Sequence, residues 1–305
     1  ESGKPFLLLG GGSNLLLTKD FAGTVTTPAK CFDIAVIMDC ETNQPSLRCW
    51  AGTTFDDVVS YAVRHGYHGL ENLSLIPGEC GASAVQNIGA YGAEVKDVIS
   101  EIEAVEISSG RVVKFKGSDC GYSYRQSAFK HEWKNQYLIT YVTYQLSRTF
   151  KPQLDYGNIR SQLEQRGITE AQLTADQLRD VIIDIRQSKL PDPVVMGNAG
   201  SFFMNPIVDA DTFATLKAAH SNLRYFEVKG DDGKVGYKIP AGWMIDQCGW
   251  KGRSLGRAGV YDKQALILVN RGGATGQEVV DLMHAVQHDV KKEFGLDLKP
   301  EVNII

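Results

Sequence analysis

The fold is decided by the stretch Ile76-Pro77-Gly78-Glu79-Cys80-Gly81-Ala82-Ser83-Ala84-Val85-Gln86-Asn87-Ile88-Gly89-Ala90-Tyr91-Gly92. It holds more small residues than a core strand or helix favours, and glycine lets a backbone come close to a ligand. The stretch therefore predicts a place where the main chain approaches something large. Ordinary glycine turns are the alternative interpretation.

A second such segment is Gly10-Gly11-Gly12-Ser13-Asn14, directly after an apolar run at 6–9. Its amides can point at a phosphate with no side chain in the way. It matches the dinucleotide fingerprint only in its first two glycines, because Leu15 stands where the third belongs, and no Gly-Lys-Ser/Thr follows. Two phosphate-cradling segments favour a long cofactor that contains a diphosphate. Two unrelated glycine turns are the alternative.

The stretch Gly200-Ser201-Phe202-Phe203-Met204-Asn205-Pro206 places a hydroxyl and an amide beside an apolar pair. Turn formers precede it at 189–193 and 197–199, where they fix the direction of the backbone. We therefore interpret Ser201 as a site residue. The alternative is a tight turn in which Ser201 and Asn205 only satisfy backbone groups.

Two charged residues are further candidates. Arg125 lies between aromatic and small polar residues at 121–127, where its planar guanidinium could bind a carboxylate through two hydrogen bonds. Glu301, between Pro300 and Val302, is placed for partial burial and an altered proton affinity. A surface ion pair for Arg125 and an edge charge for Glu301 are the alternatives.

Composition excludes several classes. The chain has 305 residues and a formal net charge of −4, with no window rich in Lys and Arg, so no nucleic-acid partner is predicted. No apolar run is long enough to span a membrane, and we expect a cytoplasmic protein. The six cysteines lack a C-x-x-C pair and are expected to be free thiols. His284 and His288 are four apart without the Glu of a zinc-protease helix, so no metal site is predicted.

Apolar periodicity and turn signals predict a mixed architecture of the α+β class. Strands are expected near 6–9, 15–17, 24–26, 34–38, 46–51, 98–107, 112–115, 136–146, 265–269 and 300–305. Helices are expected near 54–65, from 174 to Lys189, and near 211–219, 241–248 and 275–294. The segment 152–160 is expected to be a loop.

Seven motifs together carry a family resemblance. They are Gly10–Asn14, 76–78 running to 86–92, Tyr124-Arg125, Lys189–Pro193, 197–203, Ala241-Gly242-Trp243-Met244-Ile245-Asp246-Gln247 and Pro300-Glu301-Val302. In order and spacing they closely resemble the UDP-N-acetylenolpyruvoylglucosamine reductase (MurB) family of bacterial peptidoglycan synthesis. The resemblance covers nearly the whole chain.

This resemblance implies an α+β FAD-binding fold of the vanillyl-alcohol-oxidase/MurB type. It implies a first FAD-binding domain at 1–30 with 295–305, a second at 31–190, and an α+β substrate domain at 191–294. The family has an additional segment before the glycine loop, so the first domain as numbered is expected to be a fragment. Met204 stands where many members carry lysine.

The resemblance also implies the chemistry. NADPH reduces bound FAD, and the reduced flavin gives hydride to the enolpyruvyl ether of UDP-N-acetylglucosamine. Arg125 and Glu301 would stabilise the resulting enolate, and Ser201 would deliver the proton. A monomer in the bacterial cytoplasm is expected.

The other site residues implied by the resemblance fall into two sets. Cofactor-binding residues are Gly10, Gly11, Gly12, Ser13, Asn14, Pro77, Gly78, Ser83, Asn87, Gly89, Ala90, Tyr91 and Gly92; substrate-binding residues are Tyr156, Lys189, Asn205 and Gln264. Two other functions stay open at this stage. One is a different FAD oxidoreductase that oxidises an alcohol with oxygen, and the other is a nucleotide-binding module without chemistry.

Overall fold

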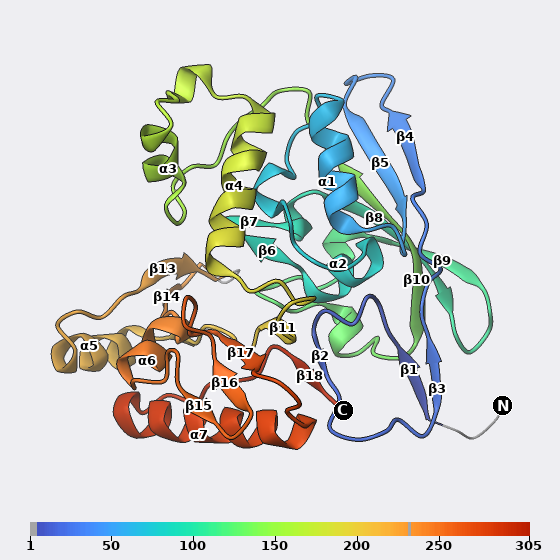
Figure 1. The fold of residues 1–305 in the computed structure, drawn as a ribbon. Coiled ribbons are helices and arrows are strands. Elements are labelled where there is room, and N and C mark those ends of the chain that lie inside the picture. Colours follow the sequence, from blue (N-terminus) through green and yellow to red (C-terminus); the bar gives the residue numbers. More distant parts are fainter. Residues whose placement is uncertain (1–4, 231–232) are drawn as a thin grey trace. The chain divides into compact units, whose positions relative to one another are not determined.

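The computed structural model describes residues 5–230 and 233–305. They form two compact units, each with its own core (Figure 1). Unit 1 contains the described residues up to Gly12 together with Ala22–Ser188, and unit 2 contains Ser13–Phe21 with the described part of Lys189–Ile305. The division into three domains that the family resemblance implies remains a prediction.

Unit 1 is built on a five-stranded antiparallel sheet. The strand order is β4 (Ile34–Met38), β5 (Pro45–Trp50), β10 (Tyr137–Gln145), β8 (Ile99–Glu106), β9 (Val112–Lys116). Along β5, buried and half-buried residues alternate, as the two-residue period of a strand requires when one face is covered. The sequence predicted all five strands to within one residue at each end.

Helices α1 (Phe55–Arg64) and α2 (Cys80–Gln86) cover one face of this sheet (Figure 1). The apolar side of α1 is buried through Phe55, Val58 and Val59, as its helical periodicity predicted. Helix α2 was not expected within the small-residue stretch. Small residues are needed there because a Cβ on Gly81 would lie 2.9 Å from the Cβ of Ala51 on the neighbouring loop.

Helices α3 (Ile159–Gln165) and α4 (Ala175–Lys189) form a smaller core of unit 1. The prediction of a loop over 152–160 is wrong at its end, because α3 begins at Ile159. Ile159 and Leu163 are four residues apart and bury the same helical face.

The remaining elements of unit 1 are short. Strand β1 (Phe6–Leu8) pairs in parallel with β3 (Thr24–Thr26), and β6 (Gly89–Ala90) pairs with β7 (Ala93–Glu94). Single 3-10 turns are η1 (Glu71–Leu73), η2 (Val95–Asp97), η3 (Gly117–Asp119), η4 (Ala128–Lys130) and η5 (Glu170–Gln172).

The described residues of unit 2 form two small antiparallel sheets and three helices. The first sheet has the order β11 (Asn198–Ser201), β17 (Ile267–Asn270), β16 (Ala258–Val260), β15 (Ser254–Leu255). The second has the order β12 (Ile207–Val208), β14 (Val235–Lys238), β13 (Phe226–Lys229). The helices are α5 (Ala210–Ala219), α6 (Ala241–Gln247) and α7 (Gly276–Phe294).

Helix α7 begins and ends where the sequence signals predicted. Thr275 and Glu278 form a reciprocal capping box at the start of α7, and Gly295 ends that helix with φ 70°. The last strand, β18 (Asn303–Ile304), pairs in parallel with β2 (Leu15–Leu16). The last strand of the chain therefore pairs inside unit 2 with a strand from the first twenty residues.

One ion pair joins two helices of unit 1 to the segment before α2. Arg179 of α4 binds both carboxylate oxygens of Asp56 at 2.7 and 2.8 Å, and the Leu75 amide donates to the same carboxylate at 2.5 Å. Burial alone raises the pKa of Asp56, but the bonds from Arg179 and Leu75 lower it more, so its pKa in the folded chain is below the usual value.

We expect Asp56→Asn to lower the free energy of unfolding by about 2 to 3 kcal/mol, because breaking a fully buried pair costs ~3–5 kcal/mol and this pair is partly exposed. A depressed carboxyl pKa stabilises the folded state above the unfolded pKa of about 3.9. The difference from wild type in urea unfolding should therefore be constant above pH ~5 and shrink as the pH falls below ~4. Asp57→Asn, on the exposed side of the same helix turn, is the control. An equal loss in both variants would contradict the role of the ion pair.

Candidate active site

The two glycine-rich segments lie side by side in unit 1. Strand β1 delivers the loop that begins at Gly10, and a Cβ on Gly10 would lie 3.1 Å from the Cβ of Ala82 in α2. The amide of Gly11 donates to the carboxylate of Glu79, the residue before α2. Gly12 has φ 72°, and a Cβ there would meet no atom within 4 Å. The paired segments thus present an open stretch of backbone.

Helix α2 connects this loop to the second half of the small-residue stretch. Its seven residues span about 10 Å at a rise of ~1.5 Å per residue. The loop at 10–12 contacts its first turn, and 87–92 follows its last. An extended ligand could therefore contact both segments, which agrees with the long cofactor that the sequence predicted.

Backbone strain is concentrated at the predicted residues. Asn87, Tyr91 and Arg125 have φ of 44°, 48° and 58°, and they are three of the six described non-glycine residues with positive φ. Such conformations are costly for Tyr and Arg and persist only where surrounding bonds hold them. They are typical of functional sites.

Arg125 supplies those bonds. Its guanidinium donates to the carbonyls of Asn87 at 3.2 Å and Gly89 at 2.5 Å. The Asn87 side chain in turn donates to the carbonyl of Ser123 at 2.8 Å. The predicted arginine is therefore fixed against the predicted cofactor segment within unit 1.

Two predicted cofactor residues before 87 have roles in packing. The carbonyl of Gly78, at φ 111°, accepts from the first amide of α1, that of Phe55. The Ser83 hydroxyl is buried and bonds the Cys80 carbonyl at 2.7 Å and the Tyr144 hydroxyl at 2.8 Å. The side chain of Ser83 therefore serves the core of unit 1.

The predicted tyrosine loop packs on the same segment. A Cβ on Gly92 would lie 3.2 Å from the ring of Tyr156, and a Cβ on Gly157 would lie 3.4 Å from the ring of Tyr91. Asn72, which the sequence interpretation missed, donates from one nitrogen to the carbonyls of Tyr91 and Gln153, both at 2.9 Å. The only signal for Asn72 was an amide within a leucine-rich stretch.

Arg186 is a second residue that the sequence interpretation missed. Its Nε donates to the carbonyl of Leu75 at 3.2 Å, and its guanidinium lies close to the Tyr91 side chain. Burial lowers the pKa of Arg186 and raises that of Tyr91. Leu75 has φ 58°, so Arg186 supports two strained turns of the cofactor segment. Its position one helical turn before Lys189 was the available signal.

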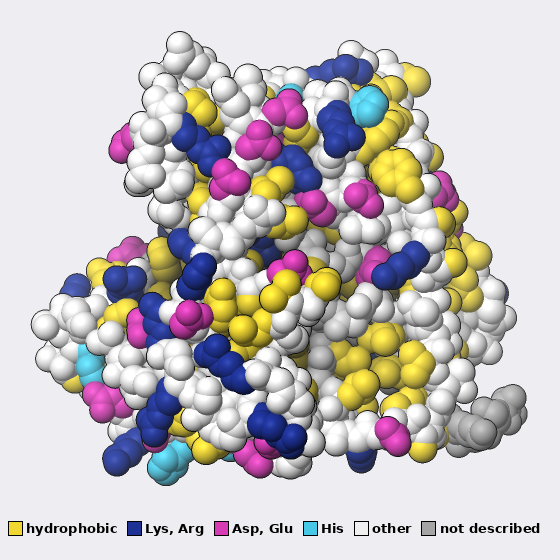
Figure 2. Space-filling model, in the orientation of Figure 1, with side chains coloured by type: hydrophobic (Ala, Val, Ile, Leu, Met, Phe, Trp, Pro, Cys, Tyr) yellow, Lys and Arg dark blue, Asp and Glu magenta, His cyan; other side chains and the backbone are white. Residues whose placement is uncertain are grey.

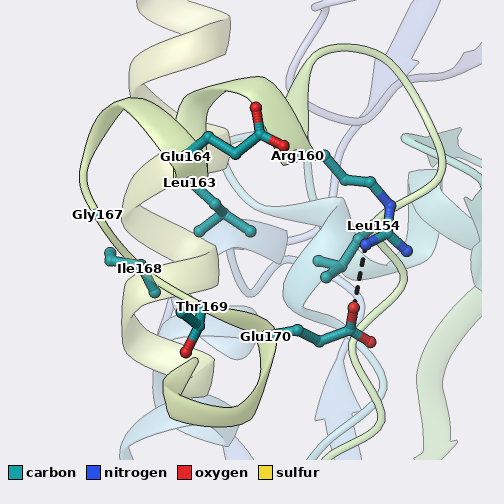
Figure 3. Close-up of a pocket in the computed structure, with 8 residues that line it drawn as sticks. All are labelled: Leu154, Arg160, Leu163, Glu164, Gly167, Ile168, Thr169 and Glu170. Carbon is teal, nitrogen blue, oxygen red and sulfur yellow. Dashed lines mark hydrogen bonds and ion pairs between the residues drawn. The ribbon is translucent and has the colours of Figure 1, made fainter.

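A hollow of about 400 Å³ lies beside α3 in unit 1 and is lined by residues between Leu154 and Glu170 (Figure 3). Arg160, which lines it, bonds Glu170 at 3.0 Å and Asp155 at 2.7 Å. None of the predicted site residues lines it.

On the face shown in Figure 2, Lys and Arg side chains are interspersed with Asp and Glu.

In unit 2, Ser201 ends β11 on an exposed edge. Phe202 and Phe203, each 1% exposed, anchor it, and the Phe202 amide donates to the Leu266 carbonyl at 2.9 Å. Gly200 has φ 73°, and a Cβ there would meet nothing within 4 Å. The phenylalanine pair thus holds a hydroxyl at an accessible position, as the sequence predicted.

Glu301 lies beside this segment. Its amide donates to the Phe202 carbonyl at 2.8 Å, and Phe203 forms an antiparallel bridge with Pro300. The side chain of Asn14 donates to the Glu301 carbonyl at 3.2 Å. Ser13 and Asn14 belong to unit 2, so unit 2 gathers Asn14, Ser201 and Glu301, while unit 1 gathers Arg125 with the cofactor segment.

Two predicted substrate residues meet at the start of α6. The Asn205 side-chain oxygen accepts from the Ala241 amide at 2.8 Å, and a Cβ on Gly242 would lie 2.9 Å from Oε1 of Gln264. The Asn205 amide is oriented by its bond to Ala241, and the Gln264 side-chain oxygen accepts from the Leu266 amide at 3.3 Å. Lys189, the third, is the last residue of α4 and is half-buried.

The described residues suit FAD. Glycines occupy the positions where side chains would collide with the cofactor segments, and Gly12 leaves its backbone open.

No helix within 5–230 or 233–305 combines the length and apolarity needed to traverse a bilayer.

Comparison with known proteins first defines the class. A family model described as "FAD binding domain" matches residues 1–116, so the chain is a flavoprotein. A second model, "UDP-N-acetylenolpyruvoylglucosamine reductase, C-terminal domain", matches residues 192–305.

Similar proteins identify the family. The chain is 51% identical over 301 residues to UDP-N-acetylenolpyruvoylglucosamine reductase of Bacteroides fragilis, covering 99% of this chain and 87% of that protein. It is 44% identical over 297 residues to that of Burkholderia ambifaria, covering 97% and 83%. The chain belongs to the UDP-N-acetylenolpyruvoylglucosamine reductase family.

A solved structure agrees with the fold. The MurB reductase from Thermus caldophilus is 21% identical and superposes with a TM-score of 0.63, covering 99% of this chain and 86% of that one. The α+β FAD-binding fold predicted from the sequence is thereby confirmed.

We expect Gly89→Ala to raise the dissociation constant for FAD at least tenfold, which corresponds to ~1.4 kcal/mol. The added Cβ would lie 2.7 Å from the Ala93 carbonyl and 3.0 Å from Arg125 Nη1, so the segment must move. Flavin absorbance per chain after gel filtration measures the loss. Gly110→Ala, in an open turn with φ 72°, should retain FAD. Full flavin content in Gly89→Ala would refute the close packing.

Proposed function

We propose that this chain reduces the enolpyruvyl ether of UDP-N-acetylglucosamine to UDP-N-acetylmuramate with NADPH as reductant. Bound FAD supplies the hydride for the methylene carbon. The observation that supports the proposal for the site is the backbone pairing, in unit 2, of the segment after Ser201 with the segment that holds Glu301: the Glu301 amide donates to the Phe202 carbonyl, and Phe203 bridges to Pro300.

The cofactor is proposed to lie along the residues that the family resemblance implies. The backbone of Gly10–Asn14 and the start of α2 would receive the diphosphate, because exposed amides after a strand favour anions. The strained segment 87–92 would support the flavin. Arg125 and Asn72 hold the backbone of that segment in place.

Arg125 is proposed to bind the substrate carboxylate. A guanidinium has five N–H donors, so the bonds to Asn87 and Gly89 orient it while it keeps its positive charge. That charge would stabilise the negative charge that grows on the carboxylate as the substrate becomes an enolate. Preorganised groups of this kind are usually the largest electrostatic contribution to catalysis.

Ser201 is proposed to give the proton to the enolate carbon. A serine hydroxyl is a weak acid, so this step depends on the strong basicity of that carbon and on exclusion of water. Glu301, when protonated, would donate a hydrogen bond to the enolate oxygen. Tyr156, Lys189, Asn205 and Gln264 would hold the diphosphate and sugar, with the lysine acting as a point charge.

We also propose that the enzyme works as a monomer in the bacterial cytoplasm. Light scattering of the purified chain would measure its mass, and a dimer would contradict the first part. Cell fractionation would test the second.

The activity itself is tested in two half-reactions under anaerobic conditions. NADPH should bleach the flavin of the purified chain, and the enolpyruvyl nucleotide sugar should restore its colour with formation of UDP-N-acetylmuramate. Recovery of colour only on admitting oxygen would instead indicate an oxidase. A chain that binds no flavin would overturn the proposal entirely.

For Ser201→Ala, we expect bleaching by NADPH at nearly the wild-type rate and reoxidation by substrate slowed at least ~10²-fold, the lower range for a lost general acid. Stopped-flow absorbance separates the two rates. Ser221→Ala, on an exposed turn of unit 2, should behave as wild type. If both half-reactions of Ser201→Ala slow equally, Ser201 is not the proton donor.

In Glu301→Gln an amide N–H replaces the carboxyl O–H and is the weaker hydrogen-bond donor to the enolate oxygen, so we expect slower reoxidation and unaltered bleaching by NADPH. Glu293→Gln, on the exposed side of α7, controls for the lost charge. A Glu301→Gln variant that is reoxidised as fast as wild type would remove Glu301 from the site.

A further inference from the structure

Glu79 is a buried carboxylate within the proposed diphosphate site that no catalytic step uses. It is 7% exposed and precedes α2, yet its side chain does not cap that helix. Instead it accepts the amide of Gly11 from the glycine loop. Within 5–230 and 233–305 it takes part in no ion pair.

The position of the carboxylate matters chemically. A glycine amide in a loop that follows a strand is the kind of donor that binds a phosphate oxygen, and here a carboxylate oxygen accepts from that amide. The carboxylate also fills the space beside the loop, since a Cβ on Gly11 would overlap it and one on Gly10 would lie 3.1 Å from Oε2. A diphosphate brought to the Gly11 amide would meet a like charge with little water to screen it.

We infer that Glu79 is an internal stand-in for the diphosphate and sets the affinity of this chain for FAD. In the cofactor-free chain its carboxylate satisfies the Gly11 amide and holds the glycine loop against α2. Entry of the diphosphate displaces the carboxylate from that amide, so part of the binding free energy is used to move it. This inference rests on the proposed function, because it assumes that FAD is the ligand of the loop.

The test is titration of the cofactor-free protein with FAD and, separately, with riboflavin, followed by quenching of flavin fluorescence. Glu79→Gln keeps the side-chain shape and an acceptor for Gly11 but removes the charge. We expect its dissociation constant for FAD to fall at least about tenfold, or ~1.4 kcal/mol. Riboflavin has no diphosphate, and its dissociation constant should be unchanged.

Glu41→Gln, an exposed carboxyl on the loop between β4 and β5 of the same unit, controls for net charge and should leave both constants as in wild type. An FAD dissociation constant in Glu79→Gln equal to or above that of wild type would overturn the inference. So would an equal gain for riboflavin. If wild type binds no FAD, the proposed function fails instead.

Glu79→Ala provides a second measurement, because it leaves the Gly11 amide without its internal acceptor. We expect a lower melting temperature than wild type for the cofactor-free protein and a larger rise on adding FAD. An unchanged melting temperature without FAD would contradict the role of Glu79 in holding the loop.

Discussion

The bonds from Arg125 to the carbonyls of Asn87 and Gly89 are the interaction on which the proposed site depends. They stabilise a turn that includes left-handed backbone at Asn87 and Tyr91, which those residues would not adopt in isolation. The same guanidinium is the proposed partner of the substrate carboxylate. One side chain would therefore shape the cofactor segment and stabilise the reaction's negative charge.

In unit 2, packing keeps the hydroxyl of Ser201, the proposed proton donor, exposed. Phe202 and Phe203 are fully packed, so the strand cannot rotate and Ser201 stays on the accessible edge. The amide of Glu301 then fixes the last segment of the chain beside this edge. Apolar burial thus supplies the precision that the proposed proton transfer needs.

Much of the fold could be predicted because its elements carry local signals. The capping box at Thr275 and the glycine at 295 marked α7, and apolar runs between turn signals marked β5 and β10. Helix α2 escaped prediction because its small residues are selected for close contact with neighbours, such as Ala51, which local sequence does not reveal.

The candidate site was predictable mainly through the family resemblance. Spacing alone indicated two anion-binding loops, and the structure brings them together. Asn72, Arg186 and Glu79 were missed because each acts through a partner distant in the sequence. A buried asparagine between Tyr91 and Gln153 has no signature beyond its own polarity.

The proposed mechanism requires that Arg125 and Glu301 act on the same enolate. A double-mutant cycle tests it most directly: the rate of reoxidation by substrate is measured for wild type, Arg125→Gln, Glu301→Gln and the double variant. When two groups stabilise the same charge, removing both raises the activation free energy by less than the sum of the two single effects. We therefore expect the two effects to deviate from additivity by at least ~1 kcal/mol. Effects that add to within ~0.5 kcal/mol would contradict the claim.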